Sequence, residues 1–207
     1  MDRIQRHHLR MPHAESGQRI GLFGGSFNPP HEGHVHVCEQ ALRKLNLSQV
    51  WWLVTPGNPL KDHSQLAPLG QRLAACEAII SNPRMKITAC EQSMTTRYTF
   101  DTLTRIVETN PGVHFVWIMG ADNLGQFHLW QRWREIAELM PIAVIDRPGS
   151  TLSLHSAKAA RVLDWCRVDE DDASLLAYTR PPAWSFLHGP RNSLSSTALR
   201  ANRTESP

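Results

Sequence analysis

Short apolar runs alternate with helix-like patterns along most of the 207-residue chain. The runs are rich in Val, Ile, Phe and Trp and are bounded by Gly, Pro or Asn, which is typical of buried strands. Five of them stand out: Ile20–Phe23, Val50–Val54, Met85–Thr88, Val113–Met119 and Ile142–Ile145. Residues 184–188 are a sixth, shorter candidate strand.

Between these runs, apolar residues recur at helical spacing. The predicted helices are His34–Leu45, Leu69–Ser81, Thr99–Glu108 and Gln131–Leu139, with a last helix from about Ser196. In the second of them, apolar side chains return every three or four positions and form one stripe, as a helix with one buried face requires.

Repeated strand–helix–strand units need crossover connections, which place parallel strands in one sheet and helices on both of its faces. The predicted fold is therefore α/β: a Rossmann-like doubly wound parallel sheet in a single domain over residues 19–207. Residues 1–18 are polar and are expected to form a flexible N-terminal arm. Ligands of such sheets bind beyond the carboxyl ends of the strands, so the loops after the strands are the candidate segments.

Composition narrows the class of protein. Lys and Arg outnumber Asp and Glu by only 22 to 19, which does not suggest a nucleic-acid-binding protein. The chain has no apolar run of the ~18–20 residues that a membrane helix needs and no signal peptide, so we expect a cytoplasmic protein without a membrane partner. Its four cysteines form no CxxC pair, which fits a reducing compartment.

The acidic run Asp169–Asp172 is interpreted as a solvated loop rather than a metal site.

The segment GGSFNPPHEGH, residues 24–34, directly follows the first predicted strand. Gly24 and Gly25 let the chain turn sharply and let a phosphate approach the backbone N–H groups, including that of Ser26. The segment then enters a helix whose first turn is a natural anion site. His31 and His34 lie at that end and can donate hydrogen bonds to phosphoryl oxygens.

Other interpretations of this segment remain open. It could be an ordinary turn with two surface histidines, or a zinc site built from His31, His34 and His36. The zinc site lacks suitably spaced further ligands, and the position after a strand favours phosphate. We therefore expect no metal held directly by the protein.

The segment resembles the HxGH signature of the nucleotidyltransferase superfamily. In its longer form, GGSFNPxHxGH, it is similar to the bacterial nicotinate-nucleotide adenylyltransferases, and all eleven positions agree. The resemblance extends from Ile20 to Arg200. It implies transfer of the adenylyl group of ATP to nicotinate mononucleotide, which gives deamido-NAD and pyrophosphate in NAD biosynthesis.

A second cradle for phosphate is expected near the C-terminus, at Ser195, Ser196, Thr197 and Arg200. Hydroxyl and N–H groups at a helix start can bind an anion, and the guanidinium offers a fixed fork of donors, although simple helix capping also explains the Ser and Thr residues. The segment is similar to the ISSTxxR motif that the family places on the phosphates of ATP. The resemblance makes Arg200 catalytic together with His31 and His34.

Gly120 directly follows the fourth predicted strand, and Asp122 comes two positions later. A carboxylate there can accept hydrogen bonds from ribose hydroxyls or can cap a helix. The family's GxDxL segment places these two residues at the nucleotide of ATP. Trp130 can stack on a pyridine ring or pack in the core; the resemblance assigns it to the pyridine and leaves Trp133 as packing.

Three further residues carry assignments from the resemblance. Thr99 matches the family's SYT segment, which lies near the pyridine carboxylate. Lys61 matches the basic residue of the PHK segment on the ATP side. Arg147 matches an RPG segment on the side of the mononucleotide. A solvated surface charge is an equal alternative for Lys61 and Arg147. Leu60 and Arg97 depart from the family pattern, and only residues 201–207 follow the last motif.

In this hypothesis Mg²⁺ arrives with ATP, the partners are ATP and nicotinate mononucleotide, and the sequence leaves the oligomeric state open. Two rival functions remain. One is a sister adenylyl- or cytidylyltransferase that uses nicotinamide mononucleotide or phosphopantetheine, since the fold alone does not separate them. The other is a non-catalytic sensor of nucleotides or metals that keeps the binding loops without turnover.

Overall fold

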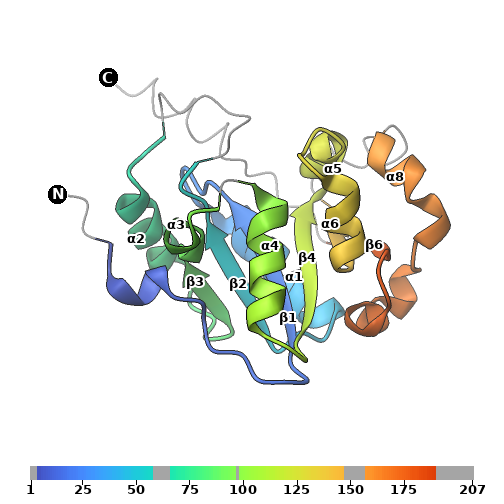
Figure 1. Cartoon of the computed structure of the whole chain (residues 1–207), viewed down its shortest axis with the longest axis horizontal. Coiled ribbons are helices and arrows are strands. Elements are labelled where there is room, and N and C mark those ends of the chain that lie inside the picture. Colours follow the sequence, from blue (N-terminus) through green and yellow to red (C-terminus); the bar gives the residue numbers. More distant parts are fainter. Residues whose placement is uncertain (1–3, 58–65, 97, 147–156, 190–207) are drawn as a thin grey trace.

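The computed structural model describes residues 4–57, 66–96, 98–146 and 157–189. Its centre is a six-stranded sheet with the strand order β3-β2-β1-β4-β5-β6 (Figure 1). Every strand pairs with its neighbours in parallel. The strands are β1 (Arg19–Gly25), β2 (Gln49–Val54), β3 (Met85–Thr88), β4 (His114–Gly120), β5 (Ile142–Ile145) and β6 (Trp184–Leu187). All six predicted strands are therefore confirmed.

The sheet is buried on both faces, as its nearly continuous apolar strands predict. Side chains alternate across it: Trp51 belongs to one core cluster and Trp52 to the other. The first cluster also takes side chains from α4 (Thr99–Thr109), α5 (Ala121–Phe127) and α6 (Trp133–Leu139). The second takes them from α1 (Glu32–Lys44) and α2 (Leu69–Ile79). Figure 1 shows α4 in front of the sheet and α1 behind it. The doubly wound fold expected from the sequence is confirmed.

The four helices predicted within the described residues are present, with shifted ends. They are α1 (Glu32–Lys44), α2 (Leu69–Ile79), α4 (Thr99–Thr109) and α6 (Trp133–Leu139). The structure adds five short elements: α3 (Cys90–Met94), α5 (Ala121–Phe127), α8 (Lys158–Val162), and the 3₁₀-helices η1 (Arg6–Leu9) and η2 (Asp164–Cys166). Elements of three to seven residues span too few turns to show a helical period.

The acidic run is exposed at three of its four residues, as expected, but it begins a 3₁₀-helix and is not the predicted loop. The side chain of Asp169 accepts a hydrogen bond from the backbone nitrogen of Asp171 and begins the 3₁₀-helix η3 (Glu170–Tyr178). Glu170 forms an ion pair with Lys44 and a second with His188, whose Nδ1 lies 2.6 Å away. Although partial burial opposes the change, the hydrogen bonds from Lys44 and His188 lower the pKa of Glu170. The run thus joins η3 to α1.

The N-terminal arm, expected to be flexible, packs along the edge of the sheet over residues 4–18. The backbone nitrogen of Ala89 donates to the carbonyl oxygen of His8 at 2.7 Å, and Thr88 Oγ1 lies 2.8 Å from the carbonyl oxygen of Arg10. Because β3 is an edge strand, polar groups at its end are available to the arm. A polar sequence hides these two contacts, since they use carbonyl groups of the arm, although Ile4, Met11 and Ala14 also pack against the core.

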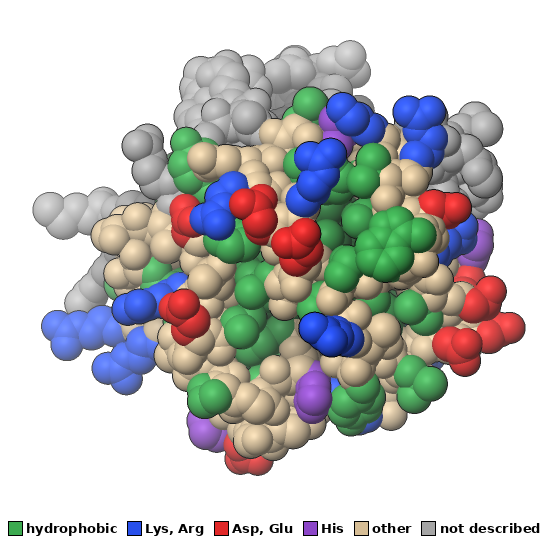
Figure 2. Space-filling view, turned by 45° about the vertical axis from the view of Figure 1, so that its right-hand side comes forward, with side chains coloured by type: hydrophobic (Ala, Val, Ile, Leu, Met, Phe, Trp, Pro, Cys, Tyr) green, Lys and Arg blue, Asp and Glu red, His purple; other side chains and the backbone are tan. Residues whose placement is uncertain are grey.

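Charges of both signs are mixed on the surface. Figure 2 turns the α5, α6 and α8 side forward and shows Lys, Arg, Asp and Glu side chains among separate hydrophobic groups. Arg132, for example, contacts Asp101 at 3.8 Å and Glu135 at 3.1 Å. Within the described residues, no helix is both long and apolar enough to cross a membrane.

Candidate active site

The two glycines that end β1 allow close packing there. A Cβ atom added at Gly24 would lie 2.5 Å from the ring of Trp117, and one at Gly25 would lie 3.1 Å from the ring of Phe27. The sequence explained these glycines by a sharp turn and by access for a phosphate. The structure adds that the strand end is covered by aromatic rings that leave no room for a side chain at Gly24.

The loop after β1 is held by its own aromatic residue. Phe27 has a positive φ of 46° and is buried, and its ring stacks on that of Trp52 at 4.8 Å with an interplanar angle of 20°. A positive φ is unfavourable for a bulky residue, so the stacking must stabilise this loop conformation. Asn28 Oδ1 also accepts a hydrogen bond from the backbone nitrogen of Ala67, which joins the loop to the start of α2.

His31 and His34 form a reciprocal cap at the beginning of α1. His31 Nδ1 accepts a hydrogen bond from the backbone nitrogen of Gly33 at 3.1 Å, and His34 Nδ1 accepts one from the backbone nitrogen of His31 at 3.2 Å. A backbone N–H can only donate, so each Nδ1 is an acceptor. In a neutral imidazole the proton must then lie on Nε2. The cap therefore gives both rings an Nε2–H group that can donate to an anion.

The two imidazoles lie face to face at the helix start. Their ring centres are 3.8 Å apart with an interplanar angle of 36°, and His31 is 5% exposed. The ring of Phe27 packs edge-on against His34 at 5.1 Å. Aromatic packing and two backbone hydrogen bonds thus fix both rings, which is the preorganisation that stabilisation of developing charge requires.

Arg72, which the sequence analysis did not single out, lies beneath this loop. This buried side chain comes from α2 and donates to four carbonyl oxygens: Ala67 at 2.8 Å, Ser26 at 2.7 Å, Thr55 at 2.8 Å and Pro56 at 3.1 Å. The planar guanidinium suits this task because its donors are fixed in a fork. One side chain therefore ties the loop after β1 to the loop after β2. An Arg within an otherwise apolar helix stripe was the only signal in the sequence.

The loop after β1 lies at the point where the strand order reverses. β1 pairs with β2 on one side and with β4 on the other, and Phe23 is in register with Ile118. The ends of β1 and β4, Gly25 and Gly120, are therefore neighbours. Such a switch point is where open α/β sheets bind ligands.

Gly120 and Asp122 begin the short helix after β4. Gly120 is the N-cap residue of α5, and Asp122 is exposed in the first turn. Asp122 is therefore not the N-cap that the alternative interpretation required. Its carboxylate lies beyond the carboxyl end of β4, on the same edge of the sheet as the His31–His34 pair.

Trp130 and Trp133 have different surroundings. Trp133 is buried in the core, as expected. Trp130 is partly buried, and its ring packs edge-on against Phe127 at 5.6 Å and against Trp117 at 6.1 Å. Because Trp117 also covers Gly24, one aromatic contact path runs from the end of β1 to Trp130.

Thr99 is the first residue of α4 and is partly exposed. Nearby, Thr102 Oγ1 lies 2.7 Å from Thr96 Oγ1 and 3.1 Å from Glu91 Oε1. Burial raises the pKa of Glu91, although hydrogen bonds from Thr55 and Thr102 oppose this change. A polar network with a largely buried carboxyl group therefore adjoins the start of α4. The sequence analysis did not include Glu91.

Several predicted site residues lie outside the described residues. They are Lys61, Arg147, Ser195, Ser196, Thr197 and Arg200, together with the departures at Leu60 and Arg97. The structure thus brings together the residues from the first phosphate cradle, the switch point and the aromatic path. It does not describe the second phosphate cradle.

The zinc alternative for the histidines gains no support from the geometry. Among the described residues, three ligand atoms converge only at His7, His8 and Glu77, and His31, His34 and His36 form no such group. The Nδ1 atoms of His31 and His34 are occupied by backbone N–H groups. The arrangement is instead suited to donating hydrogen bonds to an anion at the switch point.

Comparisons with known proteins agree with this assignment. The chain matches the cytidylyltransferase-like family over residues 22–202. It is 59% identical to a probable nicotinate-nucleotide adenylyltransferase of Rhizobium johnstonii over 95% of this chain and 98% of that protein. It is 62% identical to a protein of the same description in Mesorhizobium japonicum, over 92% of this chain and 97% of that protein.

Among solved structures, the fold resembles a Plasmodium falciparum nicotinic acid mononucleotide adenylyltransferase complexed with NaAD. The TM-score is 0.65, with 18% identity over 89% of this chain and 83% of that one. At this identity the likeness establishes the shared fold alone.

Proposed function

The chain belongs to the nicotinate-nucleotide adenylyltransferases, within the cytidylyltransferase-like family, and we propose that the residues at its β1–β4 switch point carry that reaction. The enzyme transfers the adenylyl group of ATP to nicotinate mononucleotide. A phosphate oxygen of the mononucleotide attacks the α-phosphorus, the bond to the β-phosphate oxygen breaks, and deamido-NAD and pyrophosphate form. The attacking and leaving groups are both anionic, so no proton transfer is required.

The reciprocal cap of His31 and His34 is the observation that carries the proposal. Since attack and departure need no protein base, catalysis consists of alignment and of stabilising charge on the phosphoryl oxygens. The cap leaves Nε2–H donors on two rings that packing and hydrogen bonds hold in place. We assign these donors to the phosphates of ATP, with Gly24, Gly25 and the backbone of Ser26 beside them.

The remaining assignments rest on position and on the motifs. Gly120 and Asp122 would bind the adenosine part of ATP, and Trp130 and Thr99 would bind the pyridine ring and its carboxylate. Lys61, Ser195, Ser196, Thr197 and Arg200 would bind the phosphates of ATP, and Arg147 the mononucleotide. Partial exposure of Trp130 and Thr99, compared with buried Trp133, supports a role in ligand binding.

Mg²⁺ fits this site as an ion carried by ATP. It prefers oxygen ligands, several of which are usually water or substrate phosphate. The aromatic rings of Phe23, Phe27 and Trp52, which pack against His34, carry no oxygen that could hold the ion. The phosphates would therefore hold the ion, which would reduce the negative charge of the triphosphate when bound.

Pyrophosphate release separates this function from its rivals. The purified chain is supplied with ATP or CTP and with nicotinate mononucleotide, nicotinamide mononucleotide or phosphopantetheine. We expect release with ATP and nicotinate mononucleotide, and deamido-NAD as the second product by mass. Faster release with CTP or phosphopantetheine would assign a sister transferase, and binding without release from any pair would assign a sensor.

A further inference from the structure

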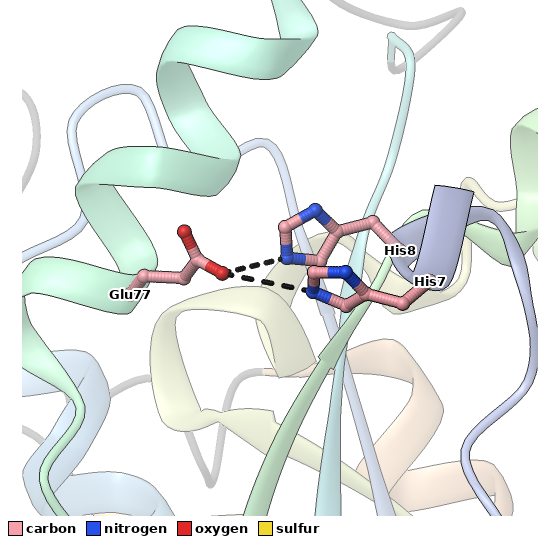
Figure 3. A group of neighbouring side chains, drawn as sticks. All are labelled: His7, His8 and Glu77. Carbon is pink, nitrogen blue, oxygen red and sulfur yellow. Dashed lines mark hydrogen bonds and ion pairs between the residues drawn. The ribbon is translucent and has the colours of Figure 1, made fainter. Parts of the chain in front are cut away.

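A second cluster of chemically reactive side chains lies away from the switch point, where the N-terminal arm meets α2. His7 and His8 come from η1, and Glu77 comes from α2 (Figure 3). Both imidazoles direct Nε2 toward the same carboxylate oxygen: His8 Nε2 lies 3.0 Å from Glu77 Oε1, and His7 Nε2 lies 3.8 Å from it. The sequence analysis did not single out any of these residues as a site.

The spacing of these three atoms is close to that of a metal coordination sphere. A tetrahedral Zn²⁺ ion with bonds of about 2.0–2.2 Å separates its ligand atoms by about 3.3–3.6 Å. The two distances to Glu77 Oε1 fall on either side of that range, and all three ligand atoms lie within 4.8 Å of one another. A small rotation of exposed side chains would therefore suffice to close the site, and solvent would supply the fourth ligand.

A simple hydrogen bond does not account for both histidines. His8 is buried and donates its Nε2–H to Glu77, which satisfies that ring. The side chain of His7 is 63% exposed, yet its ring centre lies 4.0 Å from that of His8 and its Nε2 faces the same oxygen. A second imidazole gains little there from a shared hydrogen bond, whereas a metal ion would use both rings.

The donor set of the cluster also suits a divalent cation. Imidazole nitrogens and a carboxylate oxygen are all common ligands of Zn²⁺.

The backbone around His8 is already fixed in position. Its carbonyl oxygen accepts a hydrogen bond from the backbone nitrogen of Ala89 at 2.7 Å, and Thr88 Oγ1 lies 3.1 Å away. Glu77 is held by α2. The ligands thus come from two elements whose separation is already set, so binding would cost little ordering of the chain.

We propose that His7, His8 and Glu77 bind one Zn²⁺ ion per chain and fasten the N-terminal arm to α2. Two imidazole nitrogens and one carboxylate favour zinc over Mg²⁺ or Ca²⁺, which prefer oxygen ligands. The site is structural: its ligands lie on the arm and on α2, separate from the His31–His34 pair. The ion joins residues about seventy positions apart in the sequence and so stabilises the folded state against the unfolded one.

The test is calorimetric titration of the full, untagged, metal-free chain with ZnCl₂, together with thermal melting. We expect one Zn²⁺ per chain and a higher melting temperature with zinc. Glu77→Gln keeps an oxygen that accepts from His8 but loses the charged ligand, and His7→Ala removes an exposed side chain, so both variants should fold. Each should bind zinc at least about tenfold more weakly and lose the zinc-dependent rise in melting temperature.

Two control variants locate the ion. His13 pairs with Glu15 at 3.5 Å with its side chain 83% exposed, and no third ligand from the described part of the chain joins them. His13→Ala should therefore bind zinc like the wild type. His34→Asn should also bind zinc normally. The proposal is overturned if the wild type binds no stoichiometric zinc, if zinc binding survives in both Glu77→Gln and His7→Ala, or if either control loses it. These outcomes do not depend on adenylyl transfer.

Discussion

The imidazole of His34 accepts the backbone N–H of His31 at 3.2 Å, so the second histidine of the HxGH segment holds the first in place. Because His31 in turn accepts from the backbone N–H of Gly33, each ring is fixed through its own Nδ1, and a neutral ring then carries its proton on Nε2. The spacing of His31 and His34 therefore suits a helix cap as well as an anion site. In the proposed mechanism Nε2 acts on the phosphates while Nδ1 caps the helix, so substitution can separate the two roles.

His34→Asn and His34→Ala test this separation. Asn can place its side-chain oxygen near the position of Nδ1 and can cap the helix, but it has no group at Nε2. We expect Asn to retain wild-type stability and Ala to lose about 1 kcal/mol of unfolding free energy. Both should lower kcat by roughly 10²-fold or more, with a smaller effect on ATP binding.

Chemical denaturation and steady-state kinetics measure the two effects. His36→Ala, two positions further along α1, is the matched control and should keep its activity. Wild-type turnover in His34→Asn would contradict the role of Nε2. An equal loss of activity in His36→Ala would instead favour the zinc interpretation of the three histidines.

Arg72 should be irreplaceable by lysine. A lysine keeps the charge, but its single ammonium group cannot reach the four carbonyl oxygens that the guanidinium fork serves. We expect Arg72→Lys to lower the free energy of unfolding by about 2–4 kcal/mol, and to lower kcat/KM because the loops after β1 and β2 lose their shared anchor.

Urea denaturation of the Arg72→Lys variant, with Arg84→Lys as the control, measures this loss of unfolding free energy. Arg84 is exposed and makes one long contact, with Nη1 3.4 Å from the carbonyl oxygen of Leu47. Its replacement should change stability by less than about 0.5 kcal/mol. Similar losses in the two variants would mean that the four contacts of Arg72 are not what holds the loops.

The strands could be predicted because their signals are local. Apolar runs bounded by turn residues mark the strands, and GGSFNPPHEGH follows one of them directly. Arg72 could not be predicted, because its acceptors come from segments up to 46 positions away and are backbone atoms of unremarkable sequence. The packing of the arm was missed for the same reason: its contacts at β3 use carbonyl groups, which every residue has.

Glu91 should make stability fall as the pH rises. Burial raises its pKa above the ordinary value of 4.5, so the folded chain holds the proton more tightly than the unfolded chain does. Below about pH 4.5 the neutral carboxyl group makes its full contribution to the free energy of unfolding. This contribution is lost as the pH rises through the raised pKa. Glu91→Gln keeps an oxygen for Thr102 and carries no charge, so it should melt at a higher temperature than the wild type near pH 7.

Melting curves of both proteins across this range measure the difference. The advantage of Glu91→Gln should disappear at about pH 4, where the wild-type carboxyl group is largely protonated in the folded chain. Glu108→Gln, on the exposed side of α4, is the control and should show no such trend. A wild type that gains stability over Glu91→Gln as the pH rises would contradict the argument.

Trp130→Ala should weaken binding of the acid and amide mononucleotides by similar factors. Stacking depends on the ring, which both acceptors share, and not on its substituent. Trp165, 76% exposed on η2, offers a matched control, and Trp165→Ala should leave both kcat/KM values unchanged. An unaffected Trp130→Ala enzyme would return this residue to a packing role between Phe127 and Trp117.

The ratio of kcat/KM for nicotinate and nicotinamide mononucleotide, with ATP saturating, tests the account most directly. The carboxylate can take charge-assisted hydrogen bonds from groups around Thr99, whereas the amide would turn its NH₂ toward donors. Loss of such a pairing costs on the order of 2–3 kcal/mol, so the account predicts a preference for the acid of about 30- to 150-fold. Comparable values for the two acceptors, or a preference for the amide, would contradict it.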